Sequence, residues 1–288
     1  MAESIVGGDR RDLMTAARGV RRLTPFRPFR AKPAAKLQQV RALIESLATP
    51  TLRLAPATGR TFSKLGGDPE MSPELAWPSR AGGPLAFVGQ IDLAEARAAG
   101  GPEWLPRAGA LFFFFDDQLD VADGRLGEMT VLFAQAPGAQ RRGPPAALRP
   151  DRRWRERRVA LVPGVTRPTL WWLGLQEFLL PAVANLYEAG APDHRVGGYP
   201  AELRGECLPA RCETGRHSFV PGQTDWRLLL QLDADDELGP VDDRRIYVLI
   251  READARRGDF SQTVSAVHIR PAAGGDAPFD HDCGIMRA

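Results

Sequence analysis

The chain has 288 residues, 43% of them hydrophobic and 26% charged, and its formal net charge at pH 7 is +2. This length and apolar content are enough for a packed core and exclude a wholly disordered chain. The small net charge does not indicate a nucleic-acid partner, and three cysteines, an odd number, do not form a disulfide framework.

The first 33 residues predict a loose arm, because they are rich in arginine and interrupted by Pro25, Pro28 and Pro33. They lack the apolar segment of a signal peptide. The longest apolar run of the chain, Ala110–Phe115, is too short to cross a bilayer. We therefore expect a cytoplasmic protein that does not associate with membranes.

A helix is predicted over residues 34–47, because its apolar residues recur at steps of three and four and form one stripe. Pro50 ends this helix. Residues 51–55 alternate between apolar and polar side chains and predict a short strand. Gly66 and Gly67 then predict a turn, since glycine adopts positive φ without strain.

Three strands are predicted between residues 85 and 134. Residues 85–92 form the first, and Asp92 followed by Glu95 is typical of a helix N-cap with a capping box. Residues 111–115 are apolar without alternation, which indicates a central strand covered on both faces. Residues 129–134 predict the third strand.

Residues 141–157 are rich in proline, glycine and arginine and predict a linker. Beyond them, residues 158–162 predict a strand. Residues 176–189 predict a helix, in which Pro181 falls within the first turns. Further strands are predicted at residues 226–233, 245–250 and 264–269.

Three motifs occur twice and in the same order. A Gly-Gly-x-Pro turn at residues 66–69 recurs at 197–200, a Gln-aliphatic-Asp strand end at 90–92 recurs at 231–233, and an apolar strand at 111–115 recurs at 246–250. This order, at nearly constant spacing, indicates an internal duplication. Strands with few helices predict an α+β fold of mainly antiparallel or mixed sheets, whose two similar halves pack into one body.

The domain limits follow from the repeat. We expect an arginine-rich arm and helix in residues 1–50, a first half in 51–140, a linker in 141–157 and a second half in 158–288.

The motifs resemble those of the bacterial YwqG-like family, whose function is unknown. The resemblance covers about residues 50–270 and rests on residues 63–69 with Trp77-Pro78, and on 87–92, 106–113, 197–200, 228–233 and 245–252. It implies a duplicated α+β fold with no established activity, and a link to toxin immunity, since family members lie near toxin and immunity genes. In one departure, residues 239–244 replace the family's Gly-Asp-x-Gly turn.

Two polar pairs form the main candidate site. Gln90 and Asp92, and likewise Gln231 and Asp233, stand two residues apart at strand ends, so each pair projects from one face of its strand. If the two halves pack about a pseudo-two-fold axis, the four side chains line a shared polar cleft. The alternative is structural, with each glutamine binding a buried backbone group and each aspartate capping the following turn or helix.

Lys64 is a further candidate for this cleft, because it is one of only three lysines and lies beside a glycine turn with amides that can bind an anion. The sequence contains no Walker-type phosphate loop, no Gly-x-Ser-x-Gly elbow and no His-Glu-x-x-His. We expect no cofactor and no metal, since the spacing of these residues is not that of a zinc site: Cys207, Cys212, His217, His281 and Cys283.

Because no catalytic set is assembled, the favoured hypothesis is a non-enzymatic binding or interaction protein with a protein partner such as a toxin. The alternative is an enzyme or a small-molecule binder with a polar cleft between the two halves. Nucleic acid is a third and less favoured partner, suggested only by arginine clusters in residues 10–30 and 141–158. The oligomeric state is left open.

Overall fold

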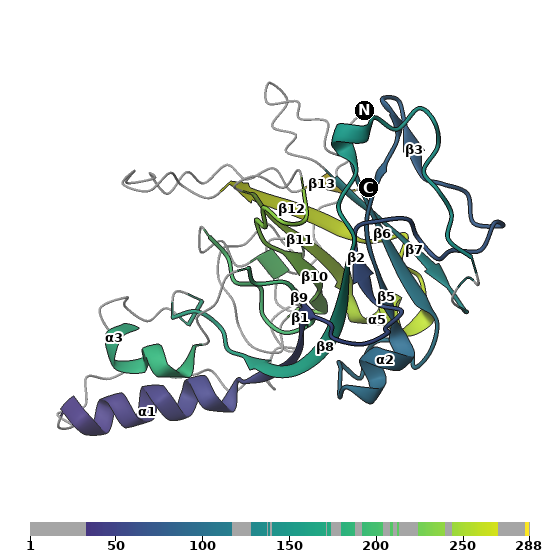
Figure 1. Cartoon of the computed structure of the whole chain (residues 1–288). Coiled ribbons are helices and arrows are strands. Elements are labelled where there is room, and N and C mark those ends of the chain that lie inside the picture. The colour runs from purple at the N-terminus through teal and green to yellow at the C-terminus, as the bar shows by residue number, and fades with distance from the viewer. Residues whose placement is uncertain are drawn as a thin grey trace, which may run out of the picture. The chain divides into compact units, whose positions relative to one another are not determined.

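One large antiparallel β-sheet organises the chain (Figure 1). The structure is a computed structural model and describes residues 33–116, 128–136, 138, 140–170, 172–173, 180–187, 192–203, 208–209, 212, 224–239, 244–269 and 286–287. Chain contacts divide it into two compact units, Met1–Gln39 and Val40–Ala288, and the sheet belongs to the second.

The sheet has eleven strands among the described residues. They are β1 (Thr49–Pro56), β2 (Lys64–Leu65), β5 (Ala86–Asp92), β6 (Ala110–Asp116), β7 (Glu128–Ala134), β8 (Arg157–Thr166), β9 (Arg195–Val196), β10 (Trp226–Leu232), β11 (Arg244–Arg251), β12 (Val264–Ile269) and β13 (Met286–Arg287). Their order across the sheet is β13-β12-β11-β10-β9-β1-β8-β2-β5-β6-β7. A separate hairpin pairs β3 (Ser79–Arg80) with β4 (Gly83–Pro84).

The middle of the sheet is the long pair β1 and β8, which runs from Thr49 opposite Thr166 to Pro56 opposite Val159. The short strand β9 continues the sheet from β1, and β2 continues it from β8. The other strands follow outward from β9 and from β2. Segments far apart in the sequence thus become neighbours in one sheet.

The sheet curls so that its two ends approach each other (Figure 1). The backbone amide of Met129 in β7 donates to the hydroxyl of Ser265 in β12 at 2.9 Å. The ring centroids of Phe133 in β7 and Phe260, just before β12, lie 5.3 Å apart. The result is a nearly closed, barrel-like sheet.

Strand β6 lies deep in the core, since Leu111–Phe115 are at most 1% exposed. Strands β5 and β7 pair with its two edges. The ring of Phe114 packs edge-on against Trp77 and Phe87, with centroids 5.2 and 5.5 Å away. These contacts confirm the predicted buried central strand.

The helices are few and short. They are α1 (Pro33–Ser46), α2 (Leu93–Ala98), α3 (Leu180–Val183) and α5 (Glu252–Arg257), with 3-10 turns η2 (Pro150–Arg152) and η4 (Ala184–Leu186). Among the described residues, no helix combines the length and the apolar character needed to cross a bilayer.

The predicted N-cap of α2 is confirmed, because Asp92 Oδ1 accepts a hydrogen bond from the Glu95 amide at 2.9 Å. The predicted capping box differs in one respect. The Glu95 carboxylate accepts hydrogen bonds from the amides of Phe62 and Ser63, at 2.7 and 3.1 Å. The hydroxyl of Ser63 instead accepts from the Asp92 amide, at 3.0 Å. The loop before β2 thereby ties down the start of the helix.

The predicted glycine turn is also confirmed, with φ of +63° at Gly66 and +71° at Gly67. A Cβ atom on Gly66 would lie only 2.0 Å from the carbonyl oxygen of Arg155. The Gly67 amide donates to the carbonyl of Trp154 at 2.9 Å. Both the positive φ and the close backbone approach therefore require glycine at position 66.

The predicted α+β fold class is wrong, and the predicted internal duplication into two similar halves stays a prediction. The structure is mostly β, and its described strands, apart from the β3–β4 hairpin, form one nearly closed antiparallel sheet. The helix predicted over residues 176–189 is described only as α3 and η4, and residues 174–179 and 188–189 lie outside the described residues. The reason for the error is that the pairing of β1 with β8 spans more than a hundred residues, which local sequence patterns do not show.

The other predicted strands occur within one or two residues of their predicted limits, except that β1 and β8 are longer than expected. The predicted domain limits stay a prediction. Within the predicted linker 141–157, Leu148 and Trp154 are buried in the main core.

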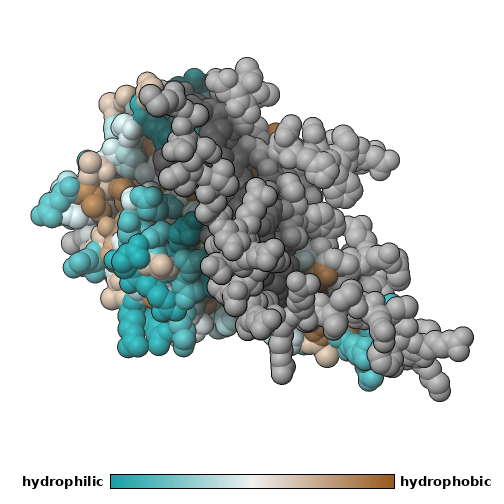
Figure 2. All heavy atoms as spheres, turned by 180° about the vertical axis from the view of Figure 1, so that it is seen from behind, coloured by the Kyte–Doolittle hydropathy of each residue, from teal (hydrophilic) through white to brown (hydrophobic). Residues whose placement is uncertain are grey.

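On the face in Figure 2, described hydrophilic side chains form a broad region beside smaller hydrophobic patches. The large hydrophobic residues exposed among those described are Leu43, Val165 and Ile269. Isolated exposed apolar side chains are ordinary on protein surfaces.

Candidate functional site

The first polar cluster surrounds Lys64, and we call it the lysine cluster; its members are Lys64, Glu70, Arg141, Glu156 and Arg158. Strand β2 holds Lys64 between Gln90 of β5 and Arg158 of β8. The Lys64 side chain is 0% exposed. Its Nζ donates to the carbonyl oxygen of Asp68 and to Glu156 Oε2, the latter at 3.1 Å.

Ion pairs connect the rest of the lysine cluster. Arg158 Nη2 lies 2.6 Å from Glu70 Oε1, and Arg141 Nη2 lies 2.8 Å from Glu156 Oε1. Burial lowers the pKa of Lys64, while the hydrogen bond and charge of Glu156 oppose this shift. Burial alone would raise the pKa of Glu156, but hydrogen bonds and charge from Lys64 and Arg141 outweigh it and hold that pKa below its usual value. In both residues, the ion pair between Lys64 and Glu156 therefore acts against the effect of burial on the pKa.

A cavity of about 540 Å³ opens beside the lysine cluster, and we call it the arginine-lined cavity. Its lining residues are Arg60, Thr61, Phe62, Glu70, Arg141 and Arg158. Arg60 is exposed and forms no hydrogen bond or ion pair with the residues that the structure describes. Arg158 is fixed, since its Nη1 donates to the carbonyl of Thr61 at 2.6 Å and its Nη2 to Glu70.

Gln90 and Gln231 are both fully buried and bind backbone groups. Gln90 Oε1 accepts from the Glu70 amide at 2.8 Å, and its Nε2 donates to the Phe62 carbonyl at 2.9 Å. Gln231 Oε1 accepts from the Ala201 amide at 2.8 Å, and its Nε2 donates to the Asp193 carbonyl at 2.9 Å. The Gln90 side chain thus joins β5 to the loops before and after β2. The Gln231 side chain likewise joins β10 to the loops before and after β9.

Asp233 is also fully enclosed, with a side-chain exposure of 0%. Its two carboxylate oxygens accept from Nε and Nη2 of Arg245 at 3.0 and 2.8 Å. The backbone amides of Asp193 and Ala234 also donate to it, each at 3.1 Å. Arg245 Nη1 in turn donates to the carbonyl of Ala201 at 2.6 Å. Asp233 therefore forms a buried, bidentate ion pair that fixes β11 to the loops on either side of β9.

A histidine–aspartate pair lies next to Asp233. His194 Nδ1 accepts from the Asp233 amide at 3.1 Å, so Nε2 carries the ring proton and donates to Asp235 Oδ2 at 3.0 Å. Arg157 donates to the same carboxylate. Burial lowers the pKa of His194, despite the opposing effect of Asp235. Both ring nitrogens are already hydrogen-bonded, so this histidine has no free nitrogen with which to act as a base. We call His194, Asp233, Asp235, Arg157 and Arg245 the histidine cluster.

The structure brings some predicted site residues together and separates others. Lys64 lies opposite Gln90, and Gln231 lies on β10 beside β9, with Asp233 just after the end of β10. The two sets lie on opposite sides of the central pair β1 and β8. None of them lines either cavity among the described residues. The role of Gln90, Asp92, Gln231, Asp233 and Lys64 in binding stays a prediction.

Sequence reasoning missed most partners of these residues, including Glu70, Glu156, His194 and Arg245. They come from segments without a motif of their own. One local signal was available. Three consecutive charged residues, Glu156, Arg157 and Arg158, stand at the start of a predicted strand, and neighbouring side chains on a strand point to opposite faces. Arg157 in fact reaches the histidine cluster, and Arg158 reaches the lysine cluster.

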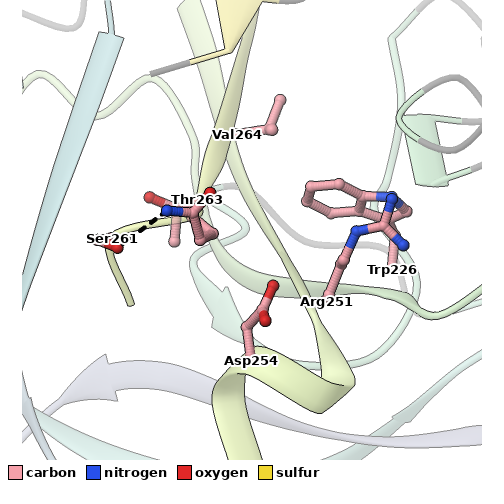
Figure 3. A pocket seen from close by; sticks show the side chains of 7 residues that line it. Trp226, Arg251, Asp254, Ser261, Thr263 and Val264 are labelled. Atoms are coloured by element: carbon pink, nitrogen blue, oxygen red, sulfur yellow. Dashed lines mark hydrogen bonds between the residues drawn. The ribbon is translucent and has the colours of Figure 1, made fainter. Parts of the chain in front are cut away.

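A second, smaller hollow of about 180 Å³ lies between β10, β11, α5 and the start of β12, and we call it the tryptophan pocket (Figure 3). Its lining residues are Trp226, Arg251, Asp254, Ser261, Gln262, Thr263 and Val264. The Arg251 guanidinium lies over the Trp226 ring, 5.0 Å from its centroid. This pocket was not predicted from the sequence.

No group of three metal-ligating side chains is found among the described residues. Cys212 is buried. The other residues weighed for zinc lie outside the described residues: Cys207, His217, His281 and Cys283.

A family model described as a domain of unknown function (DUF1963) matches residues 63–268. No curated protein matches the chain. The family match confirms the predicted resemblance to a domain of unknown function, whereas the YwqG-like name and the link to toxin immunity stay predictions. The matched segment contains both the lysine cluster and the histidine cluster.

Proposed function

Because the chain belongs to the DUF1963 family, a domain of unknown function, we propose a role from its own residues: a non-enzymatic binding protein that holds the anionic group of a small ligand. The observation that carries the proposal is the arginine-lined cavity beside Lys64. Its volume of about 540 Å³ lies within the range of small-molecule sites.

The charge of the cavity favours an anion. Three arginines, Arg60, Arg141 and Arg158, face it together with a single carboxylate, that of Glu70. Behind them, Lys64 and Glu156 offset each other as an ion pair. The lining therefore carries a net positive charge, and guanidinium groups match the geometry of carboxylate and phosphate oxygens.

The two arginines Arg158 and Arg60 differ in how firmly they are held at the cavity. Arg158 is held by Glu70 and by the Thr61 carbonyl, so little rotational freedom is lost when it contacts a ligand. Arg60 has its donors available among the described residues. A ligand anion would thus meet one preorganised and one adaptable guanidinium.

A binding role is better supported than a catalytic one. The described residues that line the cavity include no histidine, cysteine or serine. His194, the buried histidine of the histidine cluster, has both nitrogens occupied. The predicted cleft residues Gln90 and Gln231 use their amides to hold backbone groups.

The test is titration calorimetry of the whole chain with inorganic phosphate, citrate and a hexaglutamate peptide. We expect citrate or phosphate to bind, because the cavity offers several guanidinium donors to one compact anion. Arg60→Gln should weaken this binding about tenfold, which corresponds to about 1.4 kcal/mol. The variant should fold normally, since Arg60 has no described partner to lose.

The matched control is Arg97→Gln, an exposed arginine of α2 that does not line the cavity. It removes the same charge and should leave binding unchanged. Equal affinities of the Arg60→Gln and Arg97→Gln proteins would refute the site. Tight binding of hexaglutamate alone would instead indicate a protein partner and contradict the small-ligand proposal.

A further inference from the structure

The arginine-lined cavity is larger than an anionic group alone requires. Its volume of about 540 Å³ has room for on the order of eighteen water molecules, whereas a phosphate or carboxylate group is only a few water molecules in size. A ligand that fills the cavity therefore carries a further group beside its anion. The walls that the anion leaves uncovered decide the chemistry of that group.

One wall of the cavity is aromatic. Among the described residues that line the cavity, Phe62 alone is apolar. Its side chain packs against the main core and is only partly buried. The backbone of Phe62 is held from both sides, because its amide donates to Glu95 Oε1 at 2.7 Å and its carbonyl accepts from Gln90 Nε2 at 2.9 Å. Phe62 thus provides an anchored apolar side chain at the cavity.

Arg158 offers the cavity its flat face more than its donors. Its Nη1 donates to the Thr61 carbonyl and its Nη2 to Glu70, each at 2.6 Å, and its Nε lies 3.6 Å from Glu156 Oε1. The donors of a guanidinium lie in its plane, so these contacts occupy its edge and do not use its faces. The side chain is 26% exposed. A guanidinium whose edge is occupied still attracts an aromatic ring to its face, through cation–π attraction and stacking.

Arg60 supplies the partner for the anion. It is exposed and forms no hydrogen bond or ion pair with the described part of the chain. It precedes Phe62 by two residues in the loop between β1 and β2, so the anion partner and the aromatic wall are neighbours. Arg141 adds positive charge, and its side chain is 52% exposed. This spacing suits a ligand in which the ring carries the anionic group directly.

We propose that the arginine-lined cavity selects an aromatic acid, in which a carboxylate or phosphate group is attached to a planar ring. The anionic group pairs with Arg60, and the ring lies against Phe62 and the face of Arg158. This inference rests on the proposed function, because it names the ligand class of the same site. A saturated ring of similar size and equal charge lacks the π-electrons that attract a guanidinium face.

The test is calorimetric titration of the whole chain with two matched pairs of anions, phenyl phosphate with cyclohexyl phosphate and phthalate with cyclohexane-1,2-dicarboxylate. In at least one pair, which then identifies the preferred anionic group, the aromatic ligand should bind about tenfold more tightly than the saturated one. Equal or reversed affinities within both pairs would overturn the proposal. The anion site itself would survive that result if inorganic phosphate or citrate binds, whereas the failure of every anion to bind would refute both proposals.

Phe62→Leu is the companion variant, because leucine keeps the apolar packing against the core but has no aromatic ring. In this variant the preference for the aromatic ligand should fall from about tenfold to within about threefold. The matched control is Phe133→Leu, at a partly buried phenylalanine that packs against the same core and does not line the cavity. It should keep the full preference. An unchanged preference in Phe62→Leu would overturn the placement of the ring. Should Phe62→Leu fail to fold, the comparison of ligands on the wild-type chain decides the question alone.

Discussion

The ion pair between Asp233 and Arg245 gives a sharp test of how the histidine cluster contributes to stability. Replacing Asp233 by asparagine keeps the size of the side chain but removes its charge, and one of the two arginine donors then faces an amide nitrogen. Both side chains are at most 10% exposed, so water cannot replace the lost partner. Removing one member of a buried pair in this way costs about 3–5 kcal/mol.

Thermal unfolding measures the effect. At about 2 °C of melting temperature per kcal/mol for a chain of this size, we expect Asp233→Asn to melt roughly 6–10 °C below the wild type. The double variant Asp233→Asn/Arg245→Gln should recover part of this loss, because no charge is then left unpaired in the core.

Asp92→Asn is the matched control, since asparagine caps a helix about as well as aspartate. Its free energy of unfolding should change by less than about 0.5 kcal/mol. If Asp233→Asn melts within about 2 °C of the wild type, the ion pair between Asp233 and Arg245 does not stabilise the fold by the expected amount. The charge of Asp233 would then matter no more to stability than that of Asp92.

Two further predictions concern the backbone and the buried histidine. Gly66→Ala should cost at least about 1–2 kcal/mol in a urea titration, because φ is positive and the new Cβ meets the Arg155 carbonyl, whereas Gly59→Ala, with open space around it, should change stability little. Because the pKa of His194 is lowered in the folded chain, its neutral form contributes stability above the usual value of 6.5, and this is lost as pH falls below that value. The free energy of unfolding should therefore drop more steeply below pH 6.5 in the wild type than in His194→Asn, and parallel curves would contradict the lowered pKa.

The longer strands could be predicted from the sequence because their apolar patterns are strong and local. The run at residues 111–115 and the alternation at 264–269 indicate strands without any knowledge of their partners. The two-residue strands β2 and β9 could not be found in this way, because two residues show no period. They nevertheless connect the outer strands to the central pair, which is why the sheet is continuous.

The candidate site was predicted only in part, because many of its residues come from segments that are distant in the sequence. Lys64 was identified by its rarity beside a glycine turn, and Asp92 by its place before a helix. Their surroundings depend on residues brought by other strands, such as Glu156, which lies 92 positions from Lys64. Contacts of this length are set by tertiary packing and leave no pattern in the local sequence.

The apolar strand β6 has a consequence for the chain before it is folded. Six consecutive residues, Ala110–Phe115, are buried in the native sheet, and four of them are phenylalanine. The same segment has high β-propensity, no charge and no proline, which are the properties of segments that stack into cross-β aggregates. The native sheet pairs both of its edges, through β5 and β7. Each opening of these two strands would expose an aggregation-prone segment, so the rate of unfolding, rather than its equilibrium, would set how long the protein survives heating.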